Sequence, residues 1–118
     1  MITLQKHKND VWEIKINRPE KANSLSSSML EELLSIFDKA SEARGVVLTG
    51  QGTTFSAGAD LNEVKSGLAI SPIWEKLSEK IAKLNCITIA ALNGTVAGGA
   101  FGMILACDIR ICAVSYTH

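Results

Sequence analysis

The sequence predicts an α/β fold, because two kinds of apolar periodicity alternate along the chain. Residues 12–17 alternate between apolar and polar side chains, the pattern of a half-buried strand. Residues 30–40 carry apolar side chains at the spacing of an amphipathic helix. The β-branched run Val46 to Thr49 follows and is stopped by Gly50-Gln51-Gly52. Strand, helix and strand therefore succeed one another, and a ββα or βαβ layout is expected.

The first half of the chain begins with a short apolar strand candidate, Ile2 to Leu4, and Asn9-Asp10 indicates a turn before the second strand. Arg18-Pro19-Glu20 ends that strand, because proline cannot donate to a continuing ladder. A helix is expected over Ser28 to Ala43, with Ser28 and Glu31 placed as a capping box.

The second half repeats the alternation. Ser71-Pro72 is a good start for a helix that runs to Leu84 and places Trp74 and Leu77 in the core. A strand, a tight turn, a helix and a last strand are expected to follow, over Ile87 to Leu92, Asn93-Gly94, Gly99 to Ala106 and Ile109 to Ala113. The strands at 46–49, 87–92 and 109–113 are predicted to be parallel.

Length and composition bound the function. The chain has 118 residues, enough for one domain over 1–118 and no second domain, and its 47% hydrophobic content argues against disorder. Twelve basic residues balance twelve acidic ones, so no nucleic-acid partner is expected. Cys86, Cys107 and Cys112 form no disulfide framework, and a cytoplasmic location is predicted. Cys107 and Cys112 are expected to be buried, inert thiols.

A membrane span is one interpretation of the uncharged stretch from Cys86 to Cys107, which holds Gly94 and Gly98 at GxxxG spacing. Asn93-Gly94 falls in its middle, and no basic cluster flanks it. A buried strand, a turn and a buried helix explain the same residues, so no membrane span is expected.

Two glycine-bearing segments, 55–61 and 93–100, each follow a strand candidate and precede a helix candidate. Small residues there let a ligand approach the main chain, whose free N–H groups are donors for a negative oxygen. Two such points facing each other would form an oxyanion hole. From spacing alone, ordinary tight strand-to-helix turns are the favoured interpretation of both segments.

Other catalytic or metal chemistry finds little support. Ser56 lacks the first glycine of a GxSxG elbow. His7, near a surface turn, and His118, at the terminus, have no metal partner in the sequence, so no metal site is predicted. Asp60 is suited either to capping a short helix through Val64 or to binding a ligand.

Four segments of the chain form a recognisable series: Ile16 to Glu20 with Asn23 and Leu25, Val47 to Gly50, Phe55 to Leu61, and Ala90 through Gly98-Gly99 to Ile109. In these motifs and their order the sequence resembles the enoyl-CoA hydratase/isomerase, or crotonase, superfamily. The resemblance implies a crotonase-like spiral of ββα turns. The chain is expected to be an N-terminal portion lacking the C-terminal part of that fold, through truncation, splicing or an incomplete gene model.

The resemblance also implies an acyl-CoA thioester as substrate, in the lyase and isomerase chemistry of fatty acid metabolism, with no separate cofactor. Its carbonyl would be held by the backbone N–H groups of Ala59 and Gly99. Main-chain contacts to CoA would fall at four further positions, which are Ala22, Ala57, Asp60 and Leu61. Family members of full length would be homo-trimers or hexamers.

The sequence departs from the hydratase pattern at Gly102, where the first of two catalytic glutamates would stand. The second would lie beyond Asp108-Ile109, in a segment that this chain does not contain. The vacancy favours isomerisation, thioester hydrolysis or decarboxylation over hydration. The alternative is an inactive module that binds acyl-CoA or a sister subunit. Apolar surface is expected to be exposed around Met103, Ile104 and 109–114.

Overall fold

The computed structural model describes residues 1–113, and its main feature is a five-stranded sheet in the order β1-β2-β3-β5-β7. The strands of this sheet are β1 (Ile2–Lys6), β2 (Val11–Ile16), β3 (Gly45–Gly50), β5 (Ile87–Leu92) and β7 (Ile109–Cys112). The helices are α1 (Ser27–Lys39), α2 (Leu61–Val64), α3 (Ile73–Ala82) and α4 (Ala100–Ala106). The predicted alternation of strands and helices is confirmed.

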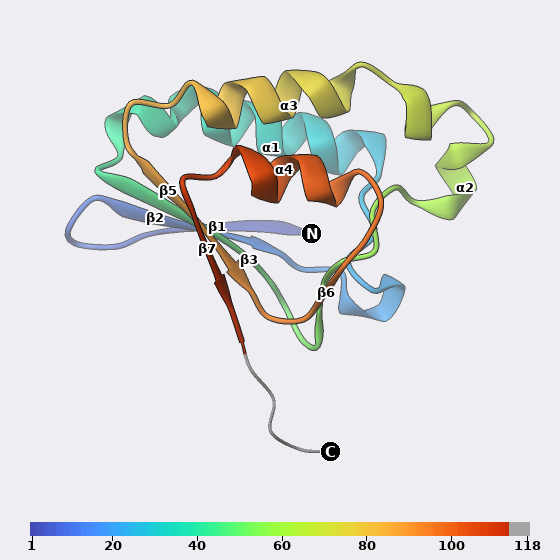
Figure 1. The fold of residues 1–118 in the computed structure, drawn as a ribbon, viewed down its shortest axis with the longest axis horizontal. Coiled ribbons are helices and arrows are strands. Elements are labelled where there is room, and N and C mark those ends of the chain that lie inside the picture. Colours follow the sequence, from blue (N-terminus) through green and yellow to red (C-terminus); the bar gives the residue numbers. More distant parts are fainter. Residues whose placement is uncertain (114–118) are drawn as a thin grey trace.

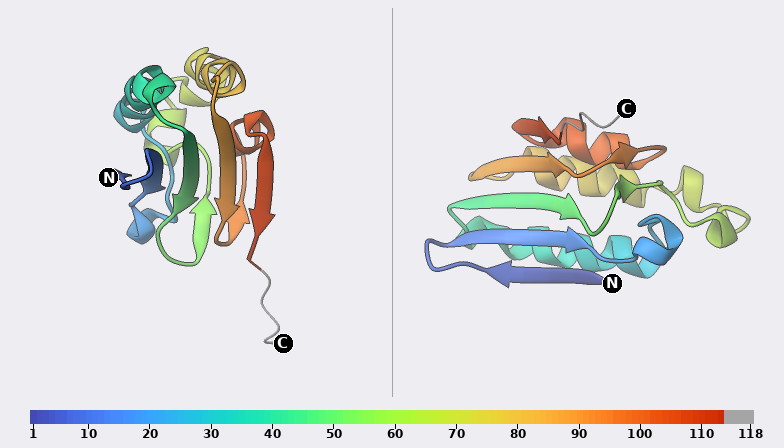
Figure 2. Two further views of the ribbon diagram at one scale, coloured as in Figure 1. Left: turned by 90° about the vertical axis from the view of Figure 1, so that its left-hand side faces the viewer. Right: turned by 90° about the horizontal axis from the view of Figure 1, so that it is seen from below.

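Strand directions follow from the connections between them. A tight turn joins β1 to β2, which pair antiparallel, whereas β2, β3, β5 and β7 run parallel to one another. Each parallel step contains one of the longer helices, and α1, α3 and α4 lie on the same face of the sheet (Figure 1). Seen from below, the other face carries no helix from residues 1–113 (Figure 2). The three strands predicted to be parallel are confirmed.

The core lies between the covered face of the sheet and the helices. Alternate residues of β2 are buried there, as their period predicted, and α1 and α3 each contribute one apolar stripe. Trp74 and Leu77 belong to this core, as expected. Each large apolar side chain buried in this way contributes roughly 1.5 to 3 kcal/mol to stability, so the layered packing fixes where the ends of the strands lie.

A second, two-stranded sheet was not predicted. It pairs β4 (Thr54–Ser56) with β6 (Thr95–Val96) in parallel. Both strands are too short and too polar to produce a recognisable period. They lie immediately beyond the carboxyl ends of β3 and β5, and they bring the two glycine-bearing segments together.

The start of α1 corrects the predicted capping box. Ser26, not Ser28, is the N-cap, and its Oγ accepts a hydrogen bond from the Met29 amide at 3.2 Å. Three consecutive serines offer equivalent caps locally, and the choice is made by Leu25, which is held in an isolated bridge with Ala59. The helix ends at Lys39 and continues as a 3₁₀ turn over Ala40–Glu42, short of the predicted Ala43.

The exposed apolar surface is only partly where it was expected. Met103 and Ile104 are buried, at 0% and 5% exposure, because that face of α4 packs toward α3 and the sheet. Ile109 and Ile111 of β7 are exposed, as predicted. Cys112 is exposed rather than buried, because β7 is an edge strand that no other described strand flanks on its outer side. Val114 and His118 lie outside the described residues.

The uncharged stretch from Cys86 to Cys107 forms β5, a turn, β6 and α4. Within residues 1–113, no helix has both the length and the apolar character needed to cross a bilayer.

Candidate active site

Three segments meet beyond the carboxyl ends of the parallel strands, where open α/β sheets usually bind ligands. The first two are residues 18–25, after β2, and residues 54–60, after β3. Ala57 donates its amide to Ala22 O at 3.0 Å, Leu25 donates to Gly58 O at 2.7 Å, and Asp60 donates to Leu25 O at 2.9 Å. Backbone hydrogen bonds therefore fix the 57–60 loop along its length.

The third segment, residues 95–99, packs against the other side of the same loop. Ala97 donates its amide to Ser56 O at 3.0 Å. A Cβ placed on Gly58 would lie 2.9 Å from Ala97 O and 3.4 Å from the Gly99 amide nitrogen. Gly58 also has a φ of +94°, which a side chain would strain. The two glycine-bearing segments singled out in the sequence are thus in direct contact.

The direction of the Ala59 amide follows from its neighbours. Gly58 O and Asp60 N are both bonded to Leu25, and in extended backbone successive residues direct their amides to opposite sides. The Ala59 N–H is therefore directed away from Leu25. Gly99 is held by different contacts: a Cβ on it would lie 2.8 Å from the Trp74 ring, so only glycine fits here without displacing the indole.

The backbone is strained where the 18–25 segment approaches the loop. Ala22 has a φ of +51° and Asn23 a φ of +55°, a left-handed conformation that costs an ordinary side chain roughly 1 to 2 kcal/mol. Such strain often marks functional sites. Asn23 tolerates it and is fully buried. Its Oδ1 accepts from the Arg18 amide at 2.8 Å, and its Nδ2 donates to Gln51 O and Thr54 O at 2.9 and 2.7 Å.

An ion pair closes the site on the α2 side. Arg18 Nη1 lies 2.6 Å from Asp60 Oδ2, and their side chains are only 17% and 7% exposed. Asp60 Oδ1 accepts from the Asn62 amide at 2.8 Å, so Asp60 caps α2 as predicted. The hydrogen bond from Arg18 is the main reason that the pKa of Asp60 lies below its ordinary value. A ligand contact at Asp60 stays a prediction.

Five of the six predicted site residues line one cavity of about 380 Å³, namely Ala22, Ala57, Ala59, Asp60 and Leu61. Leu61 is 82% exposed at its rim. Gly99 instead lines another cavity of about 490 Å³ between α3 and α4, together with Trp74, Glu75, Ser78, Glu79 and Gly102. The structure thus places five of the predicted residues in one cavity and the sixth in a different one.

Sequence reasoning missed how two polar residues, Ser56 and Asn93, hold these segments together. Ser56 Oγ donates to Asn23 O at 2.8 Å and accepts from the Gly58 amide at 3.1 Å, which gives Ser56 a structural role. Asn93 Oδ1 accepts from the Gly50 amide at 3.1 Å, and its Nδ2 donates to Gly52 O and Thr54 O at 2.8 and 3.1 Å. Polar residues clustered around glycine turns are the only sequence signal for this network.

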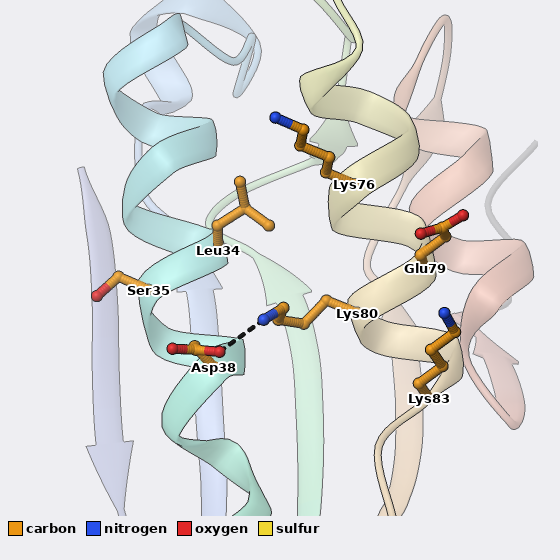
Figure 3. A pocket seen from close by; sticks show the side chains of 7 residues that line it. All are labelled: Leu34, Ser35, Asp38, Lys76, Glu79, Lys80 and Lys83. Atoms are coloured by element: carbon orange, nitrogen blue, oxygen red, sulfur yellow. Dashed lines mark hydrogen bonds and ion pairs between the residues drawn. The ribbon is translucent and has the colours of Figure 1, made fainter.

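A larger cavity lies elsewhere, in a groove of about 710 Å³ between α1 and α3. Figure 3 shows Lys80 of α3 reaching across this groove to Asp38 of α1, at 2.6 Å. Its other lining residues include Leu34, Lys76 and Lys83. The backbone network of the 18–25, 54–60 and 95–99 segments does not extend to it.

Comparisons with known proteins agree with the geometry. Residues 6–116 match the Enoyl-CoA hydratase/isomerase family. The chain is 35% identical over 118 residues to 4-chlorobenzoyl coenzyme A dehalogenase-2 of Arthrobacter sp., covering 90% of this chain and 43% of that protein. It is 31% identical over 119 residues to ethylmalonyl-CoA decarboxylase of Homo sapiens, covering 93% and 39%.

A solved structure gives the same result. The enoyl-CoA hydratase of Bacillus anthracis superposes with a TM-score of 0.84 at 35% identity, over 94% of this chain and 46% of that one. The chain therefore belongs to the enoyl-CoA hydratase/isomerase family and has the crotonase fold, as the resemblance predicted. It spans less than half the length of these relatives.

Proposed function

We propose that this chain provides an acyl-CoA site that polarises a thioester carbonyl and stabilises the enolate formed from it. The carbonyl oxygen would accept hydrogen bonds from the backbone amides of Ala59 and Gly99. The observation that carries the proposal is the direct contact of the two glycine-bearing segments at Gly58, where a Cβ would lie 3.4 Å from the Gly99 amide nitrogen. Backbone donors aimed at a developing charge are a large source of rate enhancement.

The CoA moiety would bind along the 57–61 loop. Ala22, Ala57, Asp60 and Leu61 line the same cavity as Ala59, and their small or backbone-bonded character leaves main-chain groups accessible to a ligand. The Arg18–Asp60 ion pair anchors the end of this loop. We infer that the ion pair holds the backbone amides in place and does not itself bind the thioester.

The reaction at the polarised carbon would depend on the acid/base residue. Gly102 supplies no carboxylate, which favours a reaction needing one acid/base group over hydration with two. Proteins similar to this chain include a dehalogenase, a decarboxylase and a hydratase by name. A shared thioester site with differing chemistry beside it accounts for that range.

A second candidate is a binding module without catalytic activity, for acyl-CoA or a sister subunit. The open face of the sheet favours it: Val47, Ile89 and Ile109 stand in one row of the register, and Ile87 and Ile111 on the same face are 56% and 55% exposed. An apolar face of this kind often marks an interface. A homo-trimer or hexamer would cover it.

The test is the infrared band of the thioester carbonyl of butyryl-CoA bound to the chain. Polarisation by two amides should shift this band to lower frequency, and Ala59→Pro, which removes one donor, should abolish most of the shift. Ala59→Ser keeps the amide and is the control. An unshifted band in the bound wild-type complex would refute the oxyanion hole. Hydration of crotonyl-CoA at a rate typical of enzymes would instead reject both the preference against hydration and the inactive module.

A further inference from the structure

The cavity beside Gly99 carries carboxylates from a different element than the family pattern supplies. Glu75 and Glu79 of α3 line it together with Gly99 and Gly102. We propose that Glu75 is the acid/base residue of this site and moves the proton on the carbon next to the thioester carbonyl. This inference rests on the proposed function and names the group that it leaves open.

The packing of α3 against α4 sets the position of Glu75. A Cβ on Gly99 would lie 2.8 Å from the Trp74 ring, and one on Gly102 would lie 3.1 Å from Ser78 Oγ. Trp74 and Ser78 of α3 thus lie next to Gly99 and Gly102 at the start of α4. Glu75 follows Trp74 directly and shares a helix flank with Ser78, three residues on. Along the axis of α3, Glu75 therefore lies at the level of Gly99 and Gly102 of α4.

Gly102 leaves space on the α4 side of this cavity. A side chain there would project toward Ser78 and occupy part of the 490 Å³ that the cavity offers. Because glycine stands there, a substrate acyl group and the Glu75 carboxylate can share the space. Glycine at position 102 thus removes the carboxylate of the family pattern and at the same time leaves space for the carboxylate of Glu75.

Two other carboxylates near the site, those of Asp60 and Glu63, are already engaged. Asp60 is bound to Arg18 and caps α2, and Glu63 Oε1 accepts from the Ser27 amide and hydroxyl at 3.0 and 2.7 Å. Glu79 stands one turn beyond Glu75 and also lines the groove between α1 and α3. Among residues 1–113, neither Glu75 nor Glu79 forms an ion pair. Glu75 is the one that directly follows Trp74, the residue packed against Gly99.

The step is a reversible proton transfer. The C2–H bond of the acyl group breaks and its proton goes to a carboxylate oxygen of Glu75. The electron pair of that bond forms the C1–C2 double bond, while the carbonyl π pair moves onto oxygen, opposite the Ala59 and Gly99 amides. Return of a solvent-derived proton from Glu75 to C2 completes an exchange with no net oxidation or reduction.

The experiment follows loss of the C2 protons of butyryl-CoA in D₂O by NMR, with the 118-residue chain. Glu75→Gln keeps the size of the side chain and should slow exchange by about 100-fold or more, the usual effect of a general base, while the dissociation constant for butyryl-CoA changes less than about threefold. Glu75→Asp should retain part of the rate. Glu32→Gln, with the same residue type at an exposed position of α1 outside this cavity, should exchange at the wild-type rate. Glu79→Gln tests the second carboxylate that lines the cavity.

Each outcome separates the two claims. A shifted carbonyl band with no C2 exchange, or exchange that Glu75→Gln leaves unchanged, overturns the role of Glu75 and leaves the oxyanion hole standing. A loss confined to Glu79→Gln also overturns it. An unshifted carbonyl band overturns the proposed function, and the inference with it.

Discussion

Two ion pairs of this molecule have the same length and very different surroundings. Lys80–Asp38 and Arg18–Asp60 both measure 2.6 Å, but the first has side chains that are 38% and 68% exposed, and the second 17% and 7%. The exposed pair crosses a cavity of about 710 Å³, and Asp60 of the buried pair lines a cavity of about 380 Å³. Exposed pairs contribute little because water and salt screen them.

What distinguishes the candidate site from the larger cavity is how its backbone is held. The smaller cavity is lined by Ala22, which like the next residue, Asn23, is left-handed, and by a loop that is hydrogen-bonded to its neighbours along its length. The groove between α1 and α3 is lined by long, mobile side chain types on two ordinary helices. An oxyanion site would require precisely placed backbone groups. Of the two regions, the one around the smaller cavity has a backbone that is fixed in this way.

The largest effect is expected from Asn23→Gly. Glycine accepts the left-handed backbone, so the variant removes three buried hydrogen bonds without adding strain, and we expect a loss of about 3 kcal/mol in the free energy of unfolding. Urea unfolding measures it. Asn62→Gly, at an exposed position in α2, is the control and should cost no more than about 1 kcal/mol. Equal losses would show that the Asn23 network is not what holds the region together.

Gly99→Ala should come next. Its Cβ would lie 2.8 Å from the Trp74 ring, and relief of such overpacking typically costs about 1 to 3 kcal/mol. The near-ultraviolet circular dichroism of the tryptophans should change with it. Gly45→Ala is the control, because its Cβ would lie 3.5 Å from Ile87 O, an ordinary contact distance. It should leave both the free energy of unfolding and the circular dichroism unchanged. Tolerance of Gly99→Ala would argue against a fixed Gly99 amide.

The two ion pairs can be compared directly by double-mutant cycles, Arg18→Met with Asp60→Asn and Lys80→Met with Asp38→Asn. The coupling energy should be clearly larger for the buried pair, and 1 M NaCl should remove the coupling of the exposed pair first. Coupling of equal size and equal salt sensitivity would erase the distinction between the two regions.

The buried pair also predicts a pH dependence. Arg18 lowers the pKa of Asp60 in the folded chain below the ordinary value of 3.8. The unfolded chain therefore binds the proton more readily, and the stabilisation is fully present above pH 3.8 and is lost as the pH falls through the lower folded value. The free energies of unfolding of the wild type and Asp60→Asn, measured as the pH is lowered, should therefore converge over that interval. If the two free energies of unfolding still differ at the lowest pH, the destabilisation by Asp60→Asn does not come from loss of the charge.

The smallest effect is expected from Ala22→Gly. Removing the side chain relieves left-handed strain but adds entropy to the unfolded chain, for a net stabilisation of about 0.5 kcal/mol. Thermal unfolding should detect it as a small rise in Tm. Ala82→Gly, at an exposed helical position, should lower Tm instead, since glycine in a helix costs about 1 kcal/mol. A fall in Tm for Ala22→Gly would mean that the conformation is not strained.

The sequence predicts the layers of this fold well, because the main sheet and the helices α1, α3 and α4 carry full apolar periods. It does not predict the β4–β6 sheet, whose strands of three and two residues have no period. Among the three serines before α1, the sequence favours none, and only the bridge at Leu25 selects Ser26. Met103 and Ile104 were expected at the surface because the sequence alone cannot show which face of α4 packs inward.

The candidate site divides along the same line. Glycine spacing and the family resemblance identify the two segments that meet at Gly58. The side-chain interactions that hold these segments cannot be recognised from neighbouring residues in the sequence. Arg18 and Asp60 lie 42 residues apart, and Asn23 contacts Thr54 across 31 residues. Such pairs form only because parallel strands bring their carboxyl ends to one edge of the sheet.

The most direct test of the thioester site is a titration of the ¹⁵N-labelled chain with butyryl-CoA, followed by amide NMR shifts. The amides of Ala59 and Gly99 should move together with one dissociation constant, and those of Ser35 and Lys80 in the groove between α1 and α3 should stay in place. Saturable shifts confined to the groove, or movement of Ala59 without Gly99, would contradict the account.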